Sequence, residues 1–212
     1  MNVEMQHNFP LICGKYCDWD GLFANFNDPD KAKLWVWKKR LIEQSEDNPS
    51  QWRPEKYRGE GFEAFVEALV KLMGPHPNIG ITDYSPVPSD QDYGVDGLGT
   101  GANGKPAAVQ AKFRSNTSSK LTSNDDISNF VSNAVLEQGV PQEIPESKKF
   151  RNLLIVTTAE GTHYEIENNM YVDKVRTLGY DELKRLVDHN LAFWQKFKQF
   201  GDELISANTS NQ

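Results

Sequence analysis

The chain has 212 residues, of which 38% are hydrophobic and 25% charged, and its formal net charge is −7. This is an ordinary globular composition, and at roughly 100–200 residues per domain the length suits one domain with an appendage. With two cysteines the chain is not a disulfide scaffold, and its composition excludes collagen-like and disordered classes. The acidic balance argues against a partner held by bulk electrostatics, although a local basic surface can coexist with an acidic average.

The sequence shows no sign of membrane insertion or export. No stretch approaches the roughly 20 consecutive apolar residues that a spanning helix needs, and the first residues, Met1 to Gln6, lack the basic and apolar regions of a signal peptide. We therefore expect a cytoplasmic protein with no membrane partner. Cys13 and Cys17 have no second ligand pair nearby, so two buried thiols are expected there rather than a zinc site.

The first 58 residues are neutral overall and contain four of the five tryptophans. We interpret residues 1–58 as a helical N-terminal extension. Asp28-Pro29-Asp30 is typical of a helix start, and the apolar residues that follow predict a helix as far as Ile42. Asn48-Pro49-Ser50 is expected to end it.

Residues 59–207 are expected to form one α/β domain, followed by a frayed tail at 208–212. The domain begins with an amphipathic helix from Gly61 to Met73, whose apolar residues recur at i, i+3, i+4 and i+7. Three strands are predicted next, at Ile79 to Tyr84, Tyr93 to Leu98 and Ala107 to Phe113. The glycine-rich run 97–104 is expected to supply the hairpin turn between the last two.

The second half of this domain is predicted to alternate helix and strand. A helix capped by Thr122 or Ser123 runs through Ile127 to Val135, and Leu153 to Thr157 is a short apolar run typical of a buried strand. Lys174 to Leu178 is expected to add an edge strand.

A last helix is expected to start at Asp181 and to continue, with a bend at Asn190, as far as Phe200. Its aromatic side chains, Phe193, Trp194, Phe197 and Phe200, are expected to pack in the core against the sheet, and a partner-binding stripe is the alternative. The order of the elements predicts an α/β fold with a mixed β-sheet flanked by helices.

One group of polar residues can converge on this sheet: Glu63, Asp92, Asp96, Gln110 and Lys112. Side chains alternate along a strand, so pairing across the hairpin would bring Asp96, Gln110 and Lys112 to one face. Val95, Val109 and Ala111 would then face the opposite core. Asp92 either joins the group or only caps the turn before it.

A carboxylate, an amide and a lysine on one half-buried face need partners, and a divalent cation is a suitable one. Mg²⁺ prefers oxygen ligands, which fits Asp96 with help from Gln110, Glu63 and a main-chain carbonyl. Protonated Lys112 cannot be a ligand. It can orient or deprotonate the attacking water, or neutralise charge on a phosphate in the transition state.

Three motifs in this order resemble the PD-(D/E)XK nuclease superfamily, in its Mrr-like restriction endonuclease branch. They are Gly61-Phe62-Glu63 in the helix, Asp92-Tyr93-Gly94-Val95-Asp96-Gly97 before the hairpin, and Val109-Gln110-Ala111-Lys112 after it. The resemblance covers residues 59–187 and implies a restriction-endonuclease-like fold. Leu154 to Thr158 resembles the later core strand of that fold.

The resemblance implies a role for each matching residue. Asp96 would be the metal-binding carboxylate, Ala111 would offer its main-chain carbonyl to the metal, and Lys112 would be the catalytic lysine. Gln110 would stand at the second acidic position, where most of the superfamily has Asp or Glu, which puts metal affinity in doubt. Glu63 would be the helix glutamate near the metal.

The resemblance further implies a Mg²⁺-dependent DNA endonuclease of the bacterial or phage-infected host cytosol, in which Mn²⁺ can substitute. Residues 180–194 are similar to the segment on the C-terminal side of nuclease domains fused to helicases in phage and restriction systems, so a helicase is a candidate partner besides DNA. A homodimer is compatible with the sequence. The best candidates for contact with the DNA backbone are Arg114, Lys120, Lys148 and Lys149.

Two other functions stay open at this point. One is a catalytically weak or inactive DNA-binding or assembly module that keeps the nuclease fold as a scaffold. The other is a small-molecule α/β enzyme that uses the loop from Thr158 to His163, since ligands often bind where strands end in open sheets. The glycine run lacks the Lys-Ser/Thr ending of a phosphate-binding P-loop and precedes a strand, so we interpret it as a hairpin.

Overall fold

The computed structural model describes residues 18–33, 53–87, 94–122, 127–136, 152–162 and 175–199. The chain forms two compact units. The first unit combines residues 1–72 with 182–212, and the second consists of residues 73–181.

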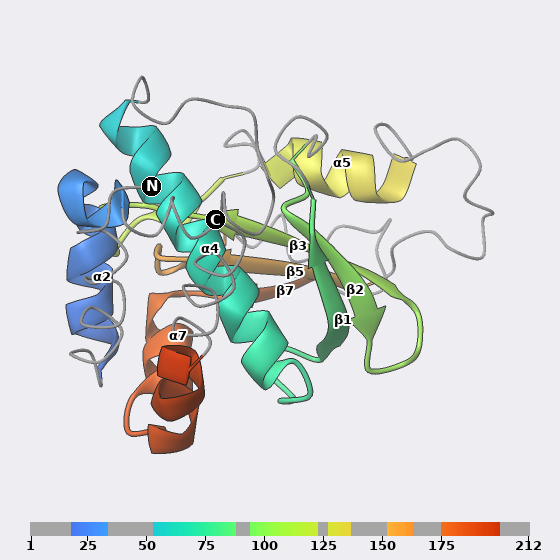
Figure 1. The fold of residues 1–212 in the computed structure, drawn as a ribbon. Coiled ribbons are helices and arrows are strands. Elements are labelled where there is room, and N and C mark those ends of the chain that lie inside the picture. Colours follow the sequence, from blue (N-terminus) through green and yellow to red (C-terminus); the bar gives the residue numbers. More distant parts are fainter. Residues whose placement is uncertain are drawn as a thin grey trace, which may run out of the picture. The chain divides into compact units, whose positions relative to one another are not determined.

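The second unit contains a five-stranded mixed sheet (Figure 1). In spatial order its strands are β1 (Ile81–Pro86), β2 (Gly97–Gly101), β3 (Pro106–Lys112), β5 (Asn152–Thr157) and β7 (Val175–Leu178). The first three strands are antiparallel neighbours, whereas β3, β5 and β7 run parallel. A separate parallel pair is formed by β4 (Lys120–Leu121) and β6 (Gly161–Thr162). The predicted α/β class with a mixed sheet is confirmed, as are the buried strand β5 and the edge strand β7.

Helix α5 (Ser128–Leu136) packs on one face of this sheet. Its buried side chains follow the helical period that the sequence shows, so the predicted helix is confirmed. They form one cluster with sheet residues: Val95, Ala108, Leu121, Ile127, Phe130, Val131, Ala134, Leu153, Ile155 and Ala159. Of the two expected caps, Ser123 lies outside the described residues and Thr122 lies six positions before Ser128, where the helix begins.

The strand register assigns β3 side chains to two faces. Ala108 pairs with Leu153 and Gln110 with Ile155, and the leucine and isoleucine belong to the cluster under α5. Because side chains alternate along a strand, Gln110 lies on that same face, while Val109 and Ala111 are buried on the other.

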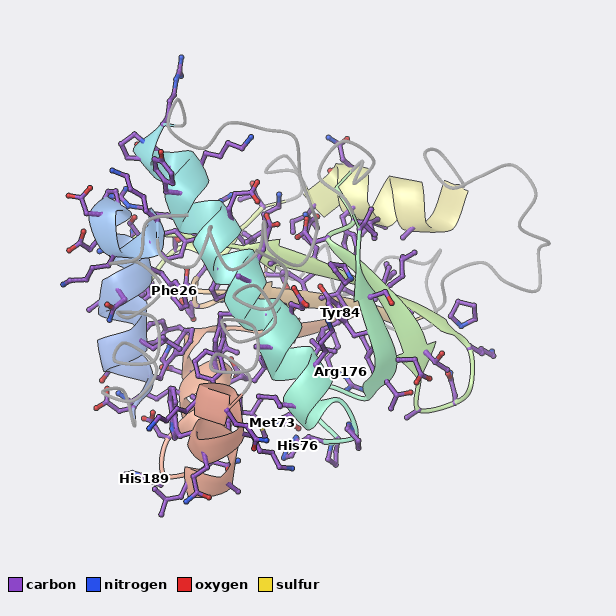
Figure 2. The ribbon with its side chains drawn as sticks, in the orientation of Figure 1. Phe26, Met73, His76, Tyr84, Arg176 and His189 are labelled. Atoms are coloured by element: carbon purple, nitrogen blue, oxygen red, sulfur yellow. The ribbon has the colours of Figure 1, made fainter. Side chains whose placement is uncertain are left out.

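The glycine-rich run is a strand where a turn was expected. Residues 97–101 form β2, and the turn follows at 102–105, where Gly104 has a φ of 74°. A Cβ at Gly97 would lie 2.3 Å from the ring of Tyr84, which is labelled in Figure 2, and one at Gly99 would lie 2.7 Å from the Thr82 carbonyl oxygen. These glycines therefore let β1 lie against β2 more closely than side chains would permit.

The strand expected from Tyr93 to Leu98 begins later than predicted, because β2 starts at Gly97. Gly94 has a φ of 85°, a left-handed conformation that extended strand residues do not adopt. The alternation expected for this segment therefore fails, and Val95 lies in the cluster with Ala108 instead of facing the opposite core. Asp92 lies outside the described residues.

In the first unit, helix α4 (Pro54–Met73) begins at Pro54 rather than at Gly61. It continues without a break past residue 58, and the division into 1–58 and 59–207 stays a prediction. Helix α2 (Trp19–Asn27) was not predicted as a separate element; the carboxylate of Asp18 caps it by accepting from the Gly21 N–H at 2.7 Å. Asp28 accepts from the Asp30 N–H at 3.0 Å, and residues 29–33 are helical, as the predicted helix start requires. The remainder of that predicted helix lies outside the described residues.

The C-terminal part of this unit contains two helices, where the sequence predicted one bent helix. Helix α7 (Tyr180–Val187) ends before His189, which has a φ of 61°, and residues 191–199 form the next helix. The side chain of Asn190 caps that second helix by accepting from the Phe193 N–H at 3.0 Å. The expected bend at Asn190 is thus a helix end followed by a new start.

The core of the first unit is aromatic. Phe65 on α4 is fully buried, and its ring centroid lies 5.3 Å from that of Trp19, 5.7 Å from that of Phe26 and 5.9 Å from that of Phe197. Figure 2 labels Phe26 on α2. Phe193, Trp194 and Phe197 of the last helix are therefore buried, as predicted, and the contacts described for them lie within the first unit. Their packing against the sheet stays a prediction, and Phe200 lies outside the described residues. Across the described part of the chain, no helix combines the length and the apolar character that crossing a membrane requires.

Candidate functional site

Asp96 lies directly before β2, and its main chain is held by both neighbouring strands. Its N–H donates to the Val109 carbonyl at 3.0 Å, and its own carbonyl accepts from the Val87 N–H at 3.0 Å and from the Tyr84 hydroxyl at 3.4 Å. Asp96 follows the turn at Gly94 and directly precedes β2. The position of the Asp96 side chain is therefore fixed by the sheet, although Asp96 itself precedes the strand.

At the end of β3 the Asp96 carboxylate accepts a main-chain hydrogen bond that a neighbouring strand would otherwise accept. Its Oδ2 accepts from the Ala111 N–H at 2.6 Å and from Nε2 of Gln110 at 3.4 Å. The bond to Ala111 is short, as hydrogen bonds to a charged acceptor are. The N–H and C=O of one strand residue point to the same side, so the Ala111 carbonyl oxygen is also directed toward the side where Asp96 lies.

Gln110 is the buried polar residue of this group, with a relative exposure of 1%. Its Oε1 is buried and has no hydrogen-bond partner among the described residues. A buried acceptor without a partner costs about 1–3 kcal/mol. This amide oxygen therefore has a reason to bind a ligand that the protein does not supply.

The oxygen atoms at this strand end suit Mg²⁺. One carboxylate, one amide oxygen and one main-chain carbonyl are ligands that this ion prefers, and it commonly completes its shell with water and substrate phosphate. The described residues contain no group of three or more His, Cys, Asp or Glu side chains that could hold a metal ion. At this strand end the described residues offer oxygen atoms from Asp96, Gln110 and Ala111.

Lys112 ends β3 on the same face as Gln110 and is partly buried. Its carbonyl accepts from Oγ1 of Thr157 at 2.7 Å and from the Thr158 N–H at 3.3 Å. The structure therefore places Lys112 two residues along the strand from the Gln110 amide, as the alternation predicts, and fixes its main chain to β5.

Arg114 follows on the same path. Its N–H donates to Oγ1 of Thr158 at 2.6 Å, and the same hydroxyl donates to the Arg114 carbonyl at 2.7 Å. Its Nη1 donates to the Phe113 carbonyl at 3.0 Å. The sequence reasoning missed the contribution of Thr157 and Thr158 to this segment; the available signal was a pair of polar residues directly after a fully apolar run.

The other predicted site residues are not brought into this group by the described structure. Glu63 lies on α4 in the other compact unit, so its place near the metal stays a prediction. Lys120 pairs with Glu160 at 3.7 Å, and both side chains are about half exposed, so this pair holds the lysine only weakly. Lys148 and Lys149 lie outside the described residues, as does His163 of the alternative loop site.

No model of a known protein family matches this chain, and no curated protein matches its sequence. The resemblance to the nuclease superfamily therefore rests on the motif residues and stays a prediction.

Proposed function

We propose that this chain is a Mg²⁺-dependent DNA endonuclease with a restriction-endonuclease-like fold, in which Mn²⁺ can substitute. The observation that carries the proposal is the set of oxygen atoms at the end of β3: the Asp96 carboxylate bound to the Ala111 N–H, and the buried Oε1 of Gln110, which has no hydrogen-bond partner among the described residues. Lys112 follows on the face that Gln110 shares. A helicase partner and a homodimer stay predictions.

In this proposal the ion, when bound, would lower the pKa of a water molecule and stabilise negative charge on the scissile phosphate. Asp96, Oε1 of Gln110 and the Ala111 carbonyl would hold it, and Glu63 would complete or position that shell. Lys112 would orient or deprotonate the attacking water. The hydrogen bonds that fix the main chain from Asp96 to Lys112 keep these groups in place before substrate arrives.

DNA binding in this protein should be modest and assisted by metal. The net charge of −7 opposes unspecific attraction to phosphate, and five of these negative charges come from residues 59–150, which contain the predicted metal ligands. Arg114 and Lys120 supply local positive charge beside β3. Tight binding of duplex DNA without metal at physiological salt would contradict the proposal.

Cleavage of plasmid and linear DNA with Mg²⁺ or Mn²⁺ tests the proposed activity. We expect Asp96→Asn and Lys112→Ala each to reduce the cleavage rate at least about a hundredfold. Asp96→Asn loses the charged metal ligand, and Lys112→Ala loses the amine that would orient or deprotonate the attacking water. Lys105→Ala is the matched control, since Lys105 is an exposed lysine in the β2–β3 turn. If both site variants cleave as fast as the control, the assignment is wrong.

A non-catalytic DNA-binding module is the second candidate, and the neutral Gln110 at the second acidic position favours it. Calorimetric titration with Mn²⁺ separates the two functions. An inert module should show no metal binding that disappears with Asp96→Asn, whereas the endonuclease should show such a site.

A further inference from the structure

We infer that Thr157 and Thr158, the residues at the end of β5, are positioning residues with separate tasks at the proposed site. Thr157 would position Lys112, and Thr158 would position Arg114. The inference rests on the proposed function and extends it, since neither threonine belongs to the predicted ligands or the predicted DNA contacts.

The Thr158 hydroxyl binds both polar groups of one residue. It accepts from the Arg114 N–H at 2.6 Å and donates to the Arg114 carbonyl at 2.7 Å. Thr158 has a relative exposure of 0%, so no water can replace it without a change in packing. The Thr158 side chain therefore pairs with both the N–H and the C=O of Arg114, as a residue of a neighbouring strand would do in a sheet.

The Thr157 hydroxyl, on the last residue of β5, binds the residue two positions before Arg114. It donates to the Lys112 carbonyl at 2.7 Å and accepts from the Ala159 N–H at 3.1 Å, and Thr157 is also fully buried. This hydroxyl joins the residue that carries the proposed catalytic amine to the turn after β5. Its direct partner is Lys112 and not Arg114.

The location of these bonds explains why they matter. The register between β3 and β5 ends with the pair Lys112 and Thr157, and residues 113–114 have no strand assignment. Beyond that pair, the Thr158 hydroxyl binds the main chain at Arg114, and the Thr157 hydroxyl binds the carbonyl of the last paired residue, Lys112. Because the guanidinium of Arg114 is itself bonded to the Phe113 carbonyl, a shift of this main chain would carry the guanidinium with it.

Removal of each hydroxyl should therefore change a different kinetic constant. Thr158→Val leaves the N–H and C=O of Arg114 without their buried partner and loosens a phosphate contact made equally in substrate and transition state, which raises KM. Thr157→Val disturbs Lys112, whose contribution belongs to the chemical step, which lowers kcat. Valine has nearly the shape of threonine, so packing is little changed.

The experiment measures KM and kcat for Mn²⁺-dependent DNA cleavage, and the salt dependence of DNA binding, in the full-length protein. We expect Thr158→Val to raise KM about tenfold with kcat changed less than about threefold, and to reduce the slope of log affinity against log salt by about one. We expect Thr157→Val to lower kcat about tenfold with KM little changed. Thr157→Ser and Thr158→Ser keep the hydroxyl and should restore parent values.

Thr162→Val is the matched control for simple loss of a buried hydroxyl. Thr162 is 5% exposed and its hydroxyl lies 2.9 Å from that of Thr177, outside the segment from Gln110 to Arg114. This variant should lower the melting temperature without separating KM from kcat. The same comparison at a temperature where every variant is folded removes any contribution from unfolding.

The outcomes distinguish this inference from the proposed function. Equal effects of both valine variants on both constants, or serine variants that fail to restore them, would overturn the inference while cleavage by the parent upholds the proposed function. A parent that binds DNA without cleaving it would overturn the proposed function, and the salt slope of Thr158→Val would still decide the part that concerns Arg114. A parent that neither binds nor cleaves DNA would overturn both.

Discussion

The aromatic core of the first unit is buried and the polar end of β3 in the second is partly buried, and different forces hold the two regions. Around Phe65 the contacts are apolar ring packings. At the end of β3 each residue is held by a specific hydrogen bond, from Ala111 to Asp96 and from the threonine hydroxyls to Lys112 and Arg114. The first region should therefore govern stability, and the second should trade stability for binding and chemistry.

The largest expected effect tests the stability side of this comparison. Phe65→Ala should lower the free energy of unfolding by about 3–5 kcal/mol, because it leaves a cavity within a cluster of fully buried rings. Leu191→Ala is the matched control. Leu191 is 66% exposed, so its loss should change stability by less than about 0.5 kcal/mol. Chemical denaturation measures both, and similar losses in the two variants would contradict the role of the aromatic core.

An intermediate effect tests the site side. Gln110→Leu removes Oε1, which has no partner in the part of the chain that the structure describes, and a long hydrogen bond to Asp96. Without metal the free energy of unfolding should therefore change by less than about 1 kcal/mol in either direction. Affinity for Mn²⁺ should fall at least about tenfold, because an amide ligand is lost. Calorimetry and denaturation with and without Mn²⁺ measure the two changes.

Gln110→Glu is the converse variant. A second carboxylate beside Asp96 should raise Mn²⁺ affinity and destabilise the metal-free protein by repulsion between like charges. The comparison of the two regions would fail if Gln110→Leu bound Mn²⁺ as the parent does, or if its loss of stability approached that of Phe65→Ala.

The two regions also differ in how far the sequence could predict them. The faces of α4 and α5 were predictable because burial imposes a period, and Phe62, Phe65, Ile127 and Phe130 are buried as that period requires. Strand β5 was predictable as a short apolar run. The position of Gln110 and Lys112 on one face followed from strand alternation in the same way. Periodicity thus predicts which side of an element is buried.

Periodicity could not predict features that depend on contacts between distant segments. Glycines such as Gly97 and Gly99 are typical of turns, yet both lie in strand β2. Glycine is needed there because a side chain would clash with the ring of Tyr84 or with the main chain at Thr82. The bond from Ala111 to Asp96 joins residues 15 positions apart, and those from Thr158 to Arg114 join residues 44 apart. No local pattern encodes these partners, so the sequence could predict which residues lie at this strand end but not the hydrogen bonds that hold them.

The smallest expected effect concerns Asp28, at the start of the helical turn at residues 29–33. Substitutions there can separate the contribution of its negative charge from that of its capping hydrogen bonds. Although partial burial would raise it, the pKa of Asp28 lies below its ordinary value, because the Lys31 side chain and the N–H groups of Lys31 and Asp30 donate to the carboxylate. A lowered pKa in the folded state means that the stabilisation is present above the ordinary pKa and is lost as pH falls through the folded one. The expected loss is less than about 0.5 kcal/mol, since solvent screens this exposed group.

Asp28→Asn keeps a capping side chain and removes the charge, so the difference in unfolding free energy between parent and variant should shrink as the solution is acidified through that range. Asp28→Ala removes the cap as well and should cost about 1 kcal/mol at neutral pH. A parent and Asp28→Asn variant whose difference is constant with pH would show that the charge of Asp28 contributes nothing there. The stability of this helix start would then come from the capping hydrogen bonds alone. It would resemble the end of β3, where hydrogen bonds hold the main chain in place.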